Sequence, residues 1–348
     1  KAQSMRSTTT IEVNGRVYHA PRRPVAVMCY EGCDPSYLAD ALVRGTAPAL
    51  ARMVRDGFYA SALSAMPSFT NPNNVSIVCG VPPAVHGVSG NYWYDRDTGR
   101  EVMMTDEGPL RAPTILARLA HAGVRVAAVT AKDKLRKALA AGLIGPGVPG
   151  LAFSAEKADG CTLAEHGIAA EEALGGRPLP DQYSPELSLF VLDAGVQLLE
   201  GQRADLLYLS LSDFVQHAHA PGAPESDAFI RAVDERMARL MAAGALVAFV
   251  ADHGMTDLSL ADGRPSIIFL GELLDRRFGT GRLKVICPIT DPFVRHHGSL
   301  GGFVRVHVLD GLDPVTVRDY LAGIPGIQHA LLREDACRIL DLPPEREG

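Results

Sequence analysis

The sequence lacks the features typical of membrane proteins, nucleic-acid-binding proteins and disulfide-rich scaffolds. No uninterrupted apolar stretch approaches the roughly 20 residues of a membrane span, and the first ten residues contain no apolar signal core. The net charge is −6, which gives no support for nucleic-acid binding. The six cysteines are scattered without zinc-finger spacing, so we interpret them as free thiols of a reducing compartment. These absences predict a cytoplasmic protein that contacts neither membrane nor nucleic acid.

Lysine is also scarce, since six lysines stand against twenty-eight arginines. Half of them, Lys132, Lys134 and Lys137, fall within six residues. Lys132 and Lys134 are alternate residues at the start of a predicted helix, where positive charge opposes the helix dipole, so helix stability does not explain them. The pattern indicates either a cationic clamp for an acidic ligand or a solvated Lys/Asp turn.

The 348 residues can bury a large core and form two domains, or one large domain with an insertion. Near-continuous apolar runs alternate with segments of helical spacing, and this succession predicts a parallel, doubly wound α/β sheet. The predicted strands of this part are 23–29, 59–66, 124–129, 205–211 and 245–250. The predicted helices are 35–56, 114–122, 169–175, 188–200 and 227–242.

From about Gly263 the pattern changes to a smaller α+β unit. We therefore predict a metal-binding catalytic core at residues 1–262 and a cap domain at residues 263–348. The cap is predicted to contain strands 266–270, 284–289 and 303–309 and helices 272–278 and 314–322.

Side chains that can bind metals follow three of the predicted strands. Glu31 follows the first strand, Asp213 and His217 follow the fourth, and Asp252-His253 follow the fifth. Ligands bind at the carboxyl ends of strands in open α/β sheets, so we expect these groups to converge on one edge. Their mixture of oxygen and nitrogen donors suits two zinc-like ions. Asp213 and His217 share one helical face, although such a pair is also common as a cap or on a surface.

Thr70 lies in the motif SFTNPNN. Asn71 suits a helix N-cap and Pro72 suits the first helical position, so Thr70 is expected at the mouth of a helix, where anions bind. The alternative is an ordinary turn before a helix. A divalent cation would lower the pKa of the threonine hydroxyl by many units, which predicts displacement at phosphorus through a phospho-threonine intermediate.

The strand-end acid, SFTNPNN, GNYWYD, SDFVQHAHAPG and ADHGM together resemble the alkaline phosphatase superfamily and, within it, the phosphonoacetate hydrolase family. The resemblance runs from about residue 24 to the end. It implies an alkaline-phosphatase-like, mostly parallel sheet sandwiched by helices, with a small α+β cap. It also implies two Zn²⁺ ions and hydrolysis of the C–P bond of phosphonoacetate to acetate and phosphate.

The resemblance implies roles for individual residues. Thr70 would be the nucleophile and a zinc ligand, and Asn91 would contact a phosphonate oxygen. We assign the ligands of the ion that activates Thr70 as Glu31, Thr70, Asp252 and His253. The other ion is assigned to Asp213 and His217. Lys132 and Lys134 would hold the substrate carboxylate, where positive charge stabilises the enolate-like charge that develops as carbon leaves phosphorus.

Two departures from the family pattern concern the metal ligands. The family has Asp where Glu31 stands, and Glu is one methylene longer. The family's last zinc histidine lies in a later HGG-like block that this chain does not contain, which leaves His296 and His297 as candidates. We therefore expect a core without its C-terminal closing segment and with one ion poorly held.

Two alternatives remain open at this point. A phosphodiesterase or phosphomonoesterase of the same superfamily would keep the metal ligands and Thr70 without needing the two lysines. A non-catalytic metal- or anion-binding homologue is the other. In each case we expect a small-molecule ligand, and a homodimer is compatible with the sequence.

Overall fold

The computed structural model of the chain describes residues 9–291 and 301–348. Its described residues form two compact units. The core unit comprises the residues up to Ser64 together with Asn74–Val81 and Ala112–Met255. The second unit comprises Ala65–Asn73, Pro82–Arg111 and the residues from Thr256 onward. The division into a 1–262 core and a 263–348 cap stays a prediction.

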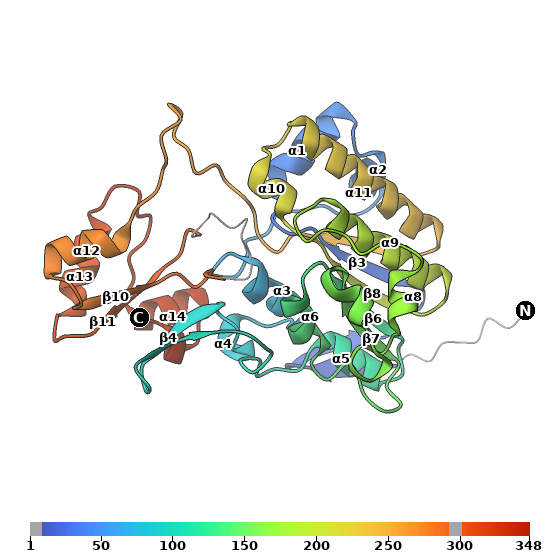
Figure 1. The fold of residues 1–348 in the computed structure, drawn as a ribbon, viewed down its shortest axis with the longest axis horizontal. Helices are drawn as coiled ribbons and strands as arrows, with labels where there is room; N and C mark the ends of the chain where they lie inside the picture. The colour runs from blue at the N-terminus through green and yellow to red at the C-terminus, as the bar shows by residue number, and fades with distance from the viewer. Residues whose placement is uncertain (1–8, 292–300) are drawn as a thin grey trace, which may run out of the picture. The chain divides into compact units, whose positions relative to one another are not determined.

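A five-stranded parallel sheet forms the centre of the core unit, as Figure 1 shows. The strand order is β7-β6-β8-β3-β9, and every neighbouring pair runs parallel. The strands are β3 (Val25–Cys29), β6 (Val126–Thr130), β7 (Gly150–Ser154), β8 (Leu206–Ser210) and β9 (Leu246–Val250). This sheet confirms the predicted α/β class and follows from the apolar runs, because strands buried on both faces need apolar residues at consecutive positions.

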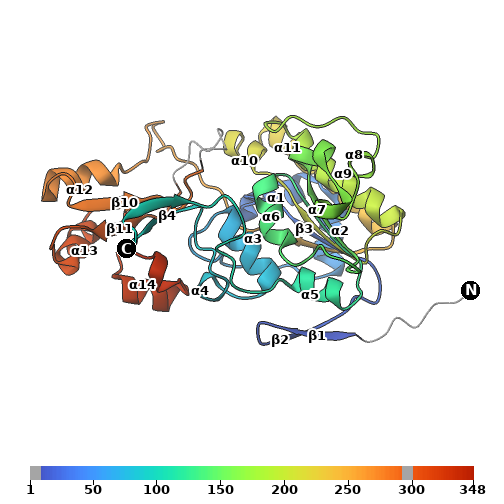
Figure 2. The ribbon, with the colours of Figure 1, turned by 60° about the horizontal axis from the view of Figure 1, so that its bottom comes forward.

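Helices cover both faces of this sheet (Figure 2). One face carries α1 (Pro35–Arg44), α2 (Pro48–Asp56), α9 (Glu186–Glu200) and α11 (Pro224–Ala242), whose apolar side chains share one cluster with the strands. On the opposite side, α5 (Ile115–His121) and α6 (Asp133–Ala140) contact β6. The core unit also contains a hairpin, β1 (Thr10–Val13) and β2 (Arg16–His19), and the short helices α7 (Leu163–His166), α8 (Ala170–Leu174), α10 (Phe214–Ala218) and η1 (Ala155–Gly160).

The second unit contains two antiparallel strand pairs. They are β4 (Tyr92–Asp95) with β5 (Arg100–Met103), and β10 (Leu283–Ile286) with β11 (Arg305–Val308). Its helices are α4 (Pro83–His86), α12 (Leu270–Phe278), α13 (Pro314–Ala322), α14 (Arg333–Leu340) and η2 (Pro344–Arg346). A small apolar cluster of α12, α13 and β10 holds part of this unit together.

The structure corrects several predicted elements. Residues 59–66 and 266–270 contain no strand. The Leu63 side chain is fully exposed, so the apolar residues of 59–66 are not buried as those of a core strand would be. The helix predicted over 35–56 is two helices, because Gly45 adopts a left-handed φ of 67° and ends α1. Strand β7 is absent from the predicted elements because Gly150 ends a Gly/Pro-rich stretch that is typical of a loop.

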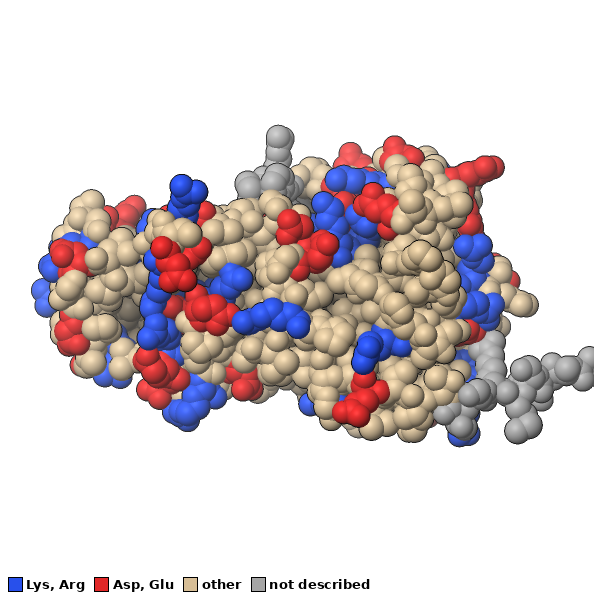
Figure 3. Space-filling view, turned by 90° about the horizontal axis from the view of Figure 1, so that it is seen from below, with Lys and Arg blue, Asp and Glu red and all other residues tan. Residues whose placement is uncertain are grey.

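The visible surface in Figure 3 interleaves acidic and basic side chains. Among the helices of residues 9–291 and 301–348, none has the length and apolar character needed to cross a bilayer.

Candidate functional site

Three neighbouring strands of the core sheet end at the same edge. In the register of the sheet, Cys29 of β3 lies opposite Ser210 of β8 and Val250 of β9. Each strand is followed within three residues by an acidic side chain, namely Glu31, Asp213 and Asp252. The predicted convergence of these strand ends is therefore confirmed within the core unit.

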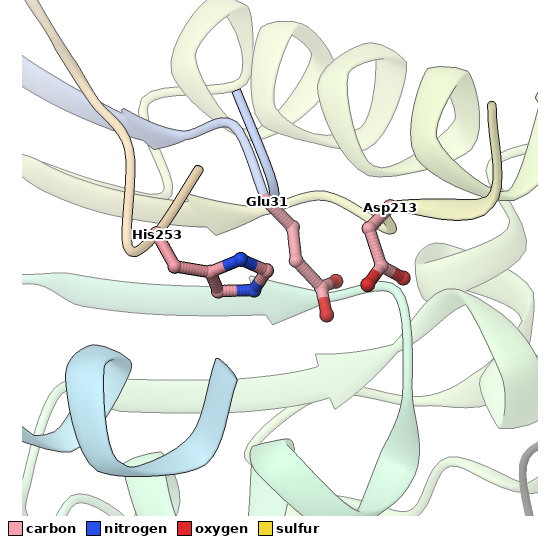
Figure 4. A group of neighbouring side chains, drawn as sticks. All are labelled: Glu31, Asp213 and His253. Atoms are coloured by element: carbon pink, nitrogen blue, oxygen red, sulfur yellow. The ribbon is translucent and has the colours of Figure 1, made fainter. Parts of the chain in front are cut away.

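Glu31, Asp213 and His253 form one buried group, and Figure 4 shows their polar ends extending into the same space. Their carboxylate oxygens and imidazole nitrogen lie within 4.8 Å of one another. A divalent ion can contact all three at that spacing. Glu31 and His253 were predicted as ligands of the ion that activates Thr70, whereas Asp213 was predicted as a ligand of the other ion. The group therefore combines residues from both predicted ligand sets.

Asp252 adjoins this group and is itself held by three donors. Its Oδ1 accepts from the backbone N–H of Gly32 at 3.2 Å and of His253 at 2.9 Å. Its Oδ2 accepts from Asn74 Nδ2 at 2.9 Å. Burial raises the pKa of the Asp252 carboxyl group, and the neighbouring His253 ring and the backbone hydrogen bonds from Gly32 and His253 oppose that rise by stabilising the carboxylate.

Asn74 belongs to helix α3 (Thr70–Cys79) and was not predicted as a site residue. The Tyr208 hydroxyl donates to Asn74 Oδ1 at 2.8 Å, which directs the Asn74 amide nitrogen toward Asp252. The sequence does contain a signal for this role, because Asn74 stands four residues after Thr70 and thus on the same helical face.

His217 pairs with Asp213, as the four-residue spacing predicts. Asp213 precedes α10 and His217 lies near its end, and His217 Nε2 is 2.9 Å from Asp213 Oδ2. This contact confirms the shared face. The assignment of His217 as a zinc ligand stays a prediction.

Lys132 lies inside the acidic group. Its Nζ is 3.2 Å from Asp213 Oδ1 and 3.5 Å from Glu31 Oε1. Burial alone would lower the pKa of Lys132, but the carboxylates of Asp213 and Glu31 outweigh burial and raise the pKa above its ordinary value. Lys132 therefore keeps its positive charge beside the two carboxylates. Lys134 stands in the first turn of α6 and is half-buried.

Three buried acids gather in this part of the core unit, namely Glu31, Asp213 and Asp252. Lys132 lies beside the first two, and His253 Nε2 lies 3.7 Å from Asp252 Oδ2. Buried carboxylates are costly unless cations pair with them or a metal ion binds. Carboxylate oxygen and imidazole nitrogen are donors that zinc prefers, so the residues fit a zinc-like ion.

Gly32 allows the backbone to turn at this site, with a φ of 69°. A Cβ there would lie 3.1 Å from Met255 Cε and 3.2 Å from Asp213 Cβ. We expect Gly32→Ala to lower the free energy of unfolding and to weaken zinc binding, because Asp213 must move. Gly15 is the matched control, since its φ is 76° and a Cβ added there would meet nothing within 4 Å.

Urea unfolding and zinc titration measure both effects. Gly15→Ala should lose only about 1 kcal/mol from the left-handed conformation and keep its zinc affinity. Equal zinc affinity in Gly32→Ala and Gly15→Ala would show that the close packing at Gly32 does not shape the metal group.

Thr70 and Asn91 belong to the second unit. Thr70 begins α3, two residues before the predicted first helical residue Pro72, so Asn71 lies in the first turn. Asn91 precedes β4 and is buried, and Asn71 Nδ2 donates to Asn91 Oδ1 at 2.6 Å. His296 and His297 lie outside the described residues.

A five-stranded parallel sheet with an acidic and imidazole group at its carboxyl edge is consistent with an alkaline-phosphatase-like fold. Residues 25–285 match the family model of type I phosphodiesterase / nucleotide pyrophosphatase. The chain belongs to this family, within the alkaline phosphatase superfamily.

Two solved structures give a closer comparison. Both are of phosphonoacetate hydrolase from Sinorhizobium meliloti 1021, one in complex with phosphonoacetate and one with phosphonoformate. In each case the sequences are 48% identical, the TM-score is 0.93, and the match covers 98% of this chain and 83% of the other. This likeness confirms the resemblance found in the sequence and supports a hydrolase.

Proposed function

We propose that the protein hydrolyses the carbon–phosphorus bond of phosphonoacetate, giving acetate and phosphate. The observation that carries this proposal is the buried group of Glu31, Asp213 and His253 in a chain 48% identical to phosphonoacetate hydrolase. We further propose that the group is part of a two-zinc centre, with Thr70, Asp252 and His217 as the other ligands. Bound zinc would lower the pKa of an alcohol and neutralise phosphonate oxygens.

Thr70 is proposed as the nucleophile. Its Oγ gives up its proton and attacks phosphorus, the new P–O bond forms as the C–P bond breaks, and the electron pair of that bond passes to carbon. The carbon then takes a proton to give acetate. Water hydrolyses the phospho-threonine, which releases phosphate and restores the Thr70 hydroxyl. Asn91 is proposed to donate to a phosphonate oxygen through its amide nitrogen.

The two lysines are proposed to stabilise the leaving carbanion. Charge from the departing carbon spreads onto the adjacent carboxylate, and an ammonium group beside it stabilises that charge as it develops. Lys132 also contacts Glu31 and Asp213, so removing Lys132 would disturb the acidic group together with the clamp. Lys134, which is half-buried in the first turn of α6, gives the cleaner test of the clamp.

We expect Lys134→Ala to lower kcat/KM for phosphonoacetate by about tenfold to a hundredfold, as loss of one stabilising charge implies. Hydrolysis of a nitrophenyl phosphate ester should fall less than twofold, because its leaving group carries no carboxylate. Lys137→Ala, on the same helix, is the matched control and should leave both activities unchanged. Steady-state kinetics on the two substrates measures this difference.

The same assay decides between phosphonoacetate and the nearest alternative. The matching family model is named for phosphodiesterases, which favours ester hydrolysis as the second candidate. Ester turnover well above phosphonoacetate turnover in the unaltered protein, with equal losses on both substrates in Lys134→Ala, would favour a phosphoesterase. Absence of both activities in a zinc-loaded protein would support a non-catalytic homologue.

A further inference from the structure

Arg305 of β11 is a buried guanidinium in the second unit, with a side chain only 1% exposed. Its Nε and Nη2 donate to the two carboxylate oxygens of Glu347 at 2.8 and 2.7 Å. The same Nη2 donates to the backbone oxygen of Ser89 at 2.9 Å and reaches Ser89 Oγ at 3.3 Å. The two-point contact with Glu347 fixes the plane of the guanidinium, so its contact with Ser89 has a defined direction.

Ser89, Gly90 and Asn91 form a loop that packs tightly beside Arg305. A Cβ on Gly90 would lie 3.0 Å from Pro288 Cβ and 3.2 Å from Arg305 Nη1. Asn91 donates its backbone N–H to Pro288 O at 2.8 Å, and its backbone oxygen accepts from Met104 N at 2.7 Å. Arg305 therefore holds this loop from one side while the chain at Pro288 holds it from another.

The Asn91 side chain has a fixed orientation. Asn71 Nδ2 donates to Asn91 Oδ1, so the Asn91 amide nitrogen is the end that can donate to a ligand. That nitrogen reaches Ile289 O at 3.3 Å and carries a second hydrogen. An amide held in this way can donate to an anion without first rotating, provided that its backbone stays in place.

We infer that Arg305 is a positioning residue, which acts on substrate only by holding Ser89 and Gly90 so that Asn91 presents its amide N–H. This inference rests on the proposed role of Asn91 in binding a phosphonate oxygen. Arg305 itself does not touch the substrate. Its effect on catalysis should therefore disappear when the Asn91 amide is absent.

A double-mutant cycle tests this dependence, because residues that act through one another give non-additive effects. The variants are Arg305→Met, Asn91→Ala and the combination, with kcat/KM for phosphonoacetate as the readout. We expect Arg305→Met to lower kcat/KM at least tenfold in the unaltered background and less than twofold in Asn91→Ala. Equal fold-losses in the two backgrounds, or no effect of Asn91→Ala alone, would overturn the inference.

Three further measurements keep the test decisive. Arg305→Lys retains the charge beside Glu347 but cannot make the two-point contact. It replaces Arg305→Met if that variant does not fold, and its effect on kcat/KM should likewise be large in the unaltered background and small in Asn91→Ala.

Arg282→Met is the control, because it removes the exposed pair with Asp310 in the same unit, and it should not change kcat/KM. If the protein does not turn over phosphonoacetate, the proposed substrate fails, and the same cycle on the Kd of phosphonoformate, measured by calorimetry, still decides the role of Arg305.

Discussion

Replacing Thr70 with alanine is expected to lower phosphonoacetate turnover by about 10³-fold or more, as loss of a catalytic nucleophile does. The reason is that no other group in the proposal supplies an oxygen for attack on phosphorus. Substrate binding should persist, because Asn91 and the lysines remain. The measurement is kcat by phosphate release, together with the Kd of phosphonoacetate by calorimetry.

Two neighbouring hydroxyl variants serve as controls. Thr70→Ser keeps the alcohol and should retain turnover far above that of Thr70→Ala. Ser68→Ala removes an exposed hydroxyl two residues earlier and should leave kcat unchanged. Turnover in Thr70→Ala within tenfold of the unaltered protein would mean that water attacks phosphorus directly, and the phospho-threonine intermediate would be wrong.

The second large effect is expected for Asp213→Asn, with opposite consequences for metal binding and for the stability of the metal-free chain. Asp213 is one of three buried acids at this edge of the sheet, and Glu31 stays beside Lys132 when Asp213 becomes neutral, so the metal-free chain loses a buried negative charge without leaving Lys132 unpaired. Zinc affinity should fall at least 100-fold and phosphonoacetate turnover should fall with it. The free energy of unfolding without metal should not decrease.

Asp205→Asn is the matched control, because Asp205 precedes β8 whereas Asp213 follows it. Asp205 pairs with Arg125 at 2.8 Å, away from the metal group, so its loss should cost about 1 kcal/mol of stability and leave zinc binding intact. Zinc titration and urea unfolding of both variants, with and without chelator, give the comparison. Unchanged zinc affinity in Asp213→Asn would remove Asp213 from the metal centre.

The core sheet could be predicted because its sequence pattern is strong. Strands β3, β8 and β9 are short apolar runs, each followed closely by a polar residue that can bind metal. Parallel strands must end at a common edge, so the pattern also placed Glu31, Asp213 and Asp252 together. The rule that parallel strands end at a common edge therefore predicted both the sheet and the position of its acidic residues.

Other features depend on contacts that no local pattern contains. The apolar segment 59–66 resembles a strand, but it pairs with no neighbour and Leu63 is fully exposed. Strand β7 is buried, but it was not predicted because it directly follows a Gly/Pro-rich loop. In both segments, pairing with distant strands determined whether a strand formed, and the local composition did not.

Contacts between residues far apart in the sequence also shape the site, and these could not be predicted. The spacing of Lys132 and Lys134 suggested one shared role, whereas Lys132 contacts two of the metal-group acids. Asn74 reaches Asp252, and Arg305 reaches Ser89, across separations of 178 and 216 residues. Such contacts become visible only when the chain is folded.

Glu31, Asp213 and His253 are proposed to hold a divalent ion in a site able to activate an alcohol. The most direct measurement is an anomalous-scattering map at the zinc edge from crystals of the protein soaked with zinc and phosphonoacetate. We expect a peak bounded by those three side chains, with the Thr70 hydroxyl and a phosphonate oxygen beside the metal centre. A fully zinc-loaded crystal with no peak at Glu31, Asp213 and His253 would contradict it.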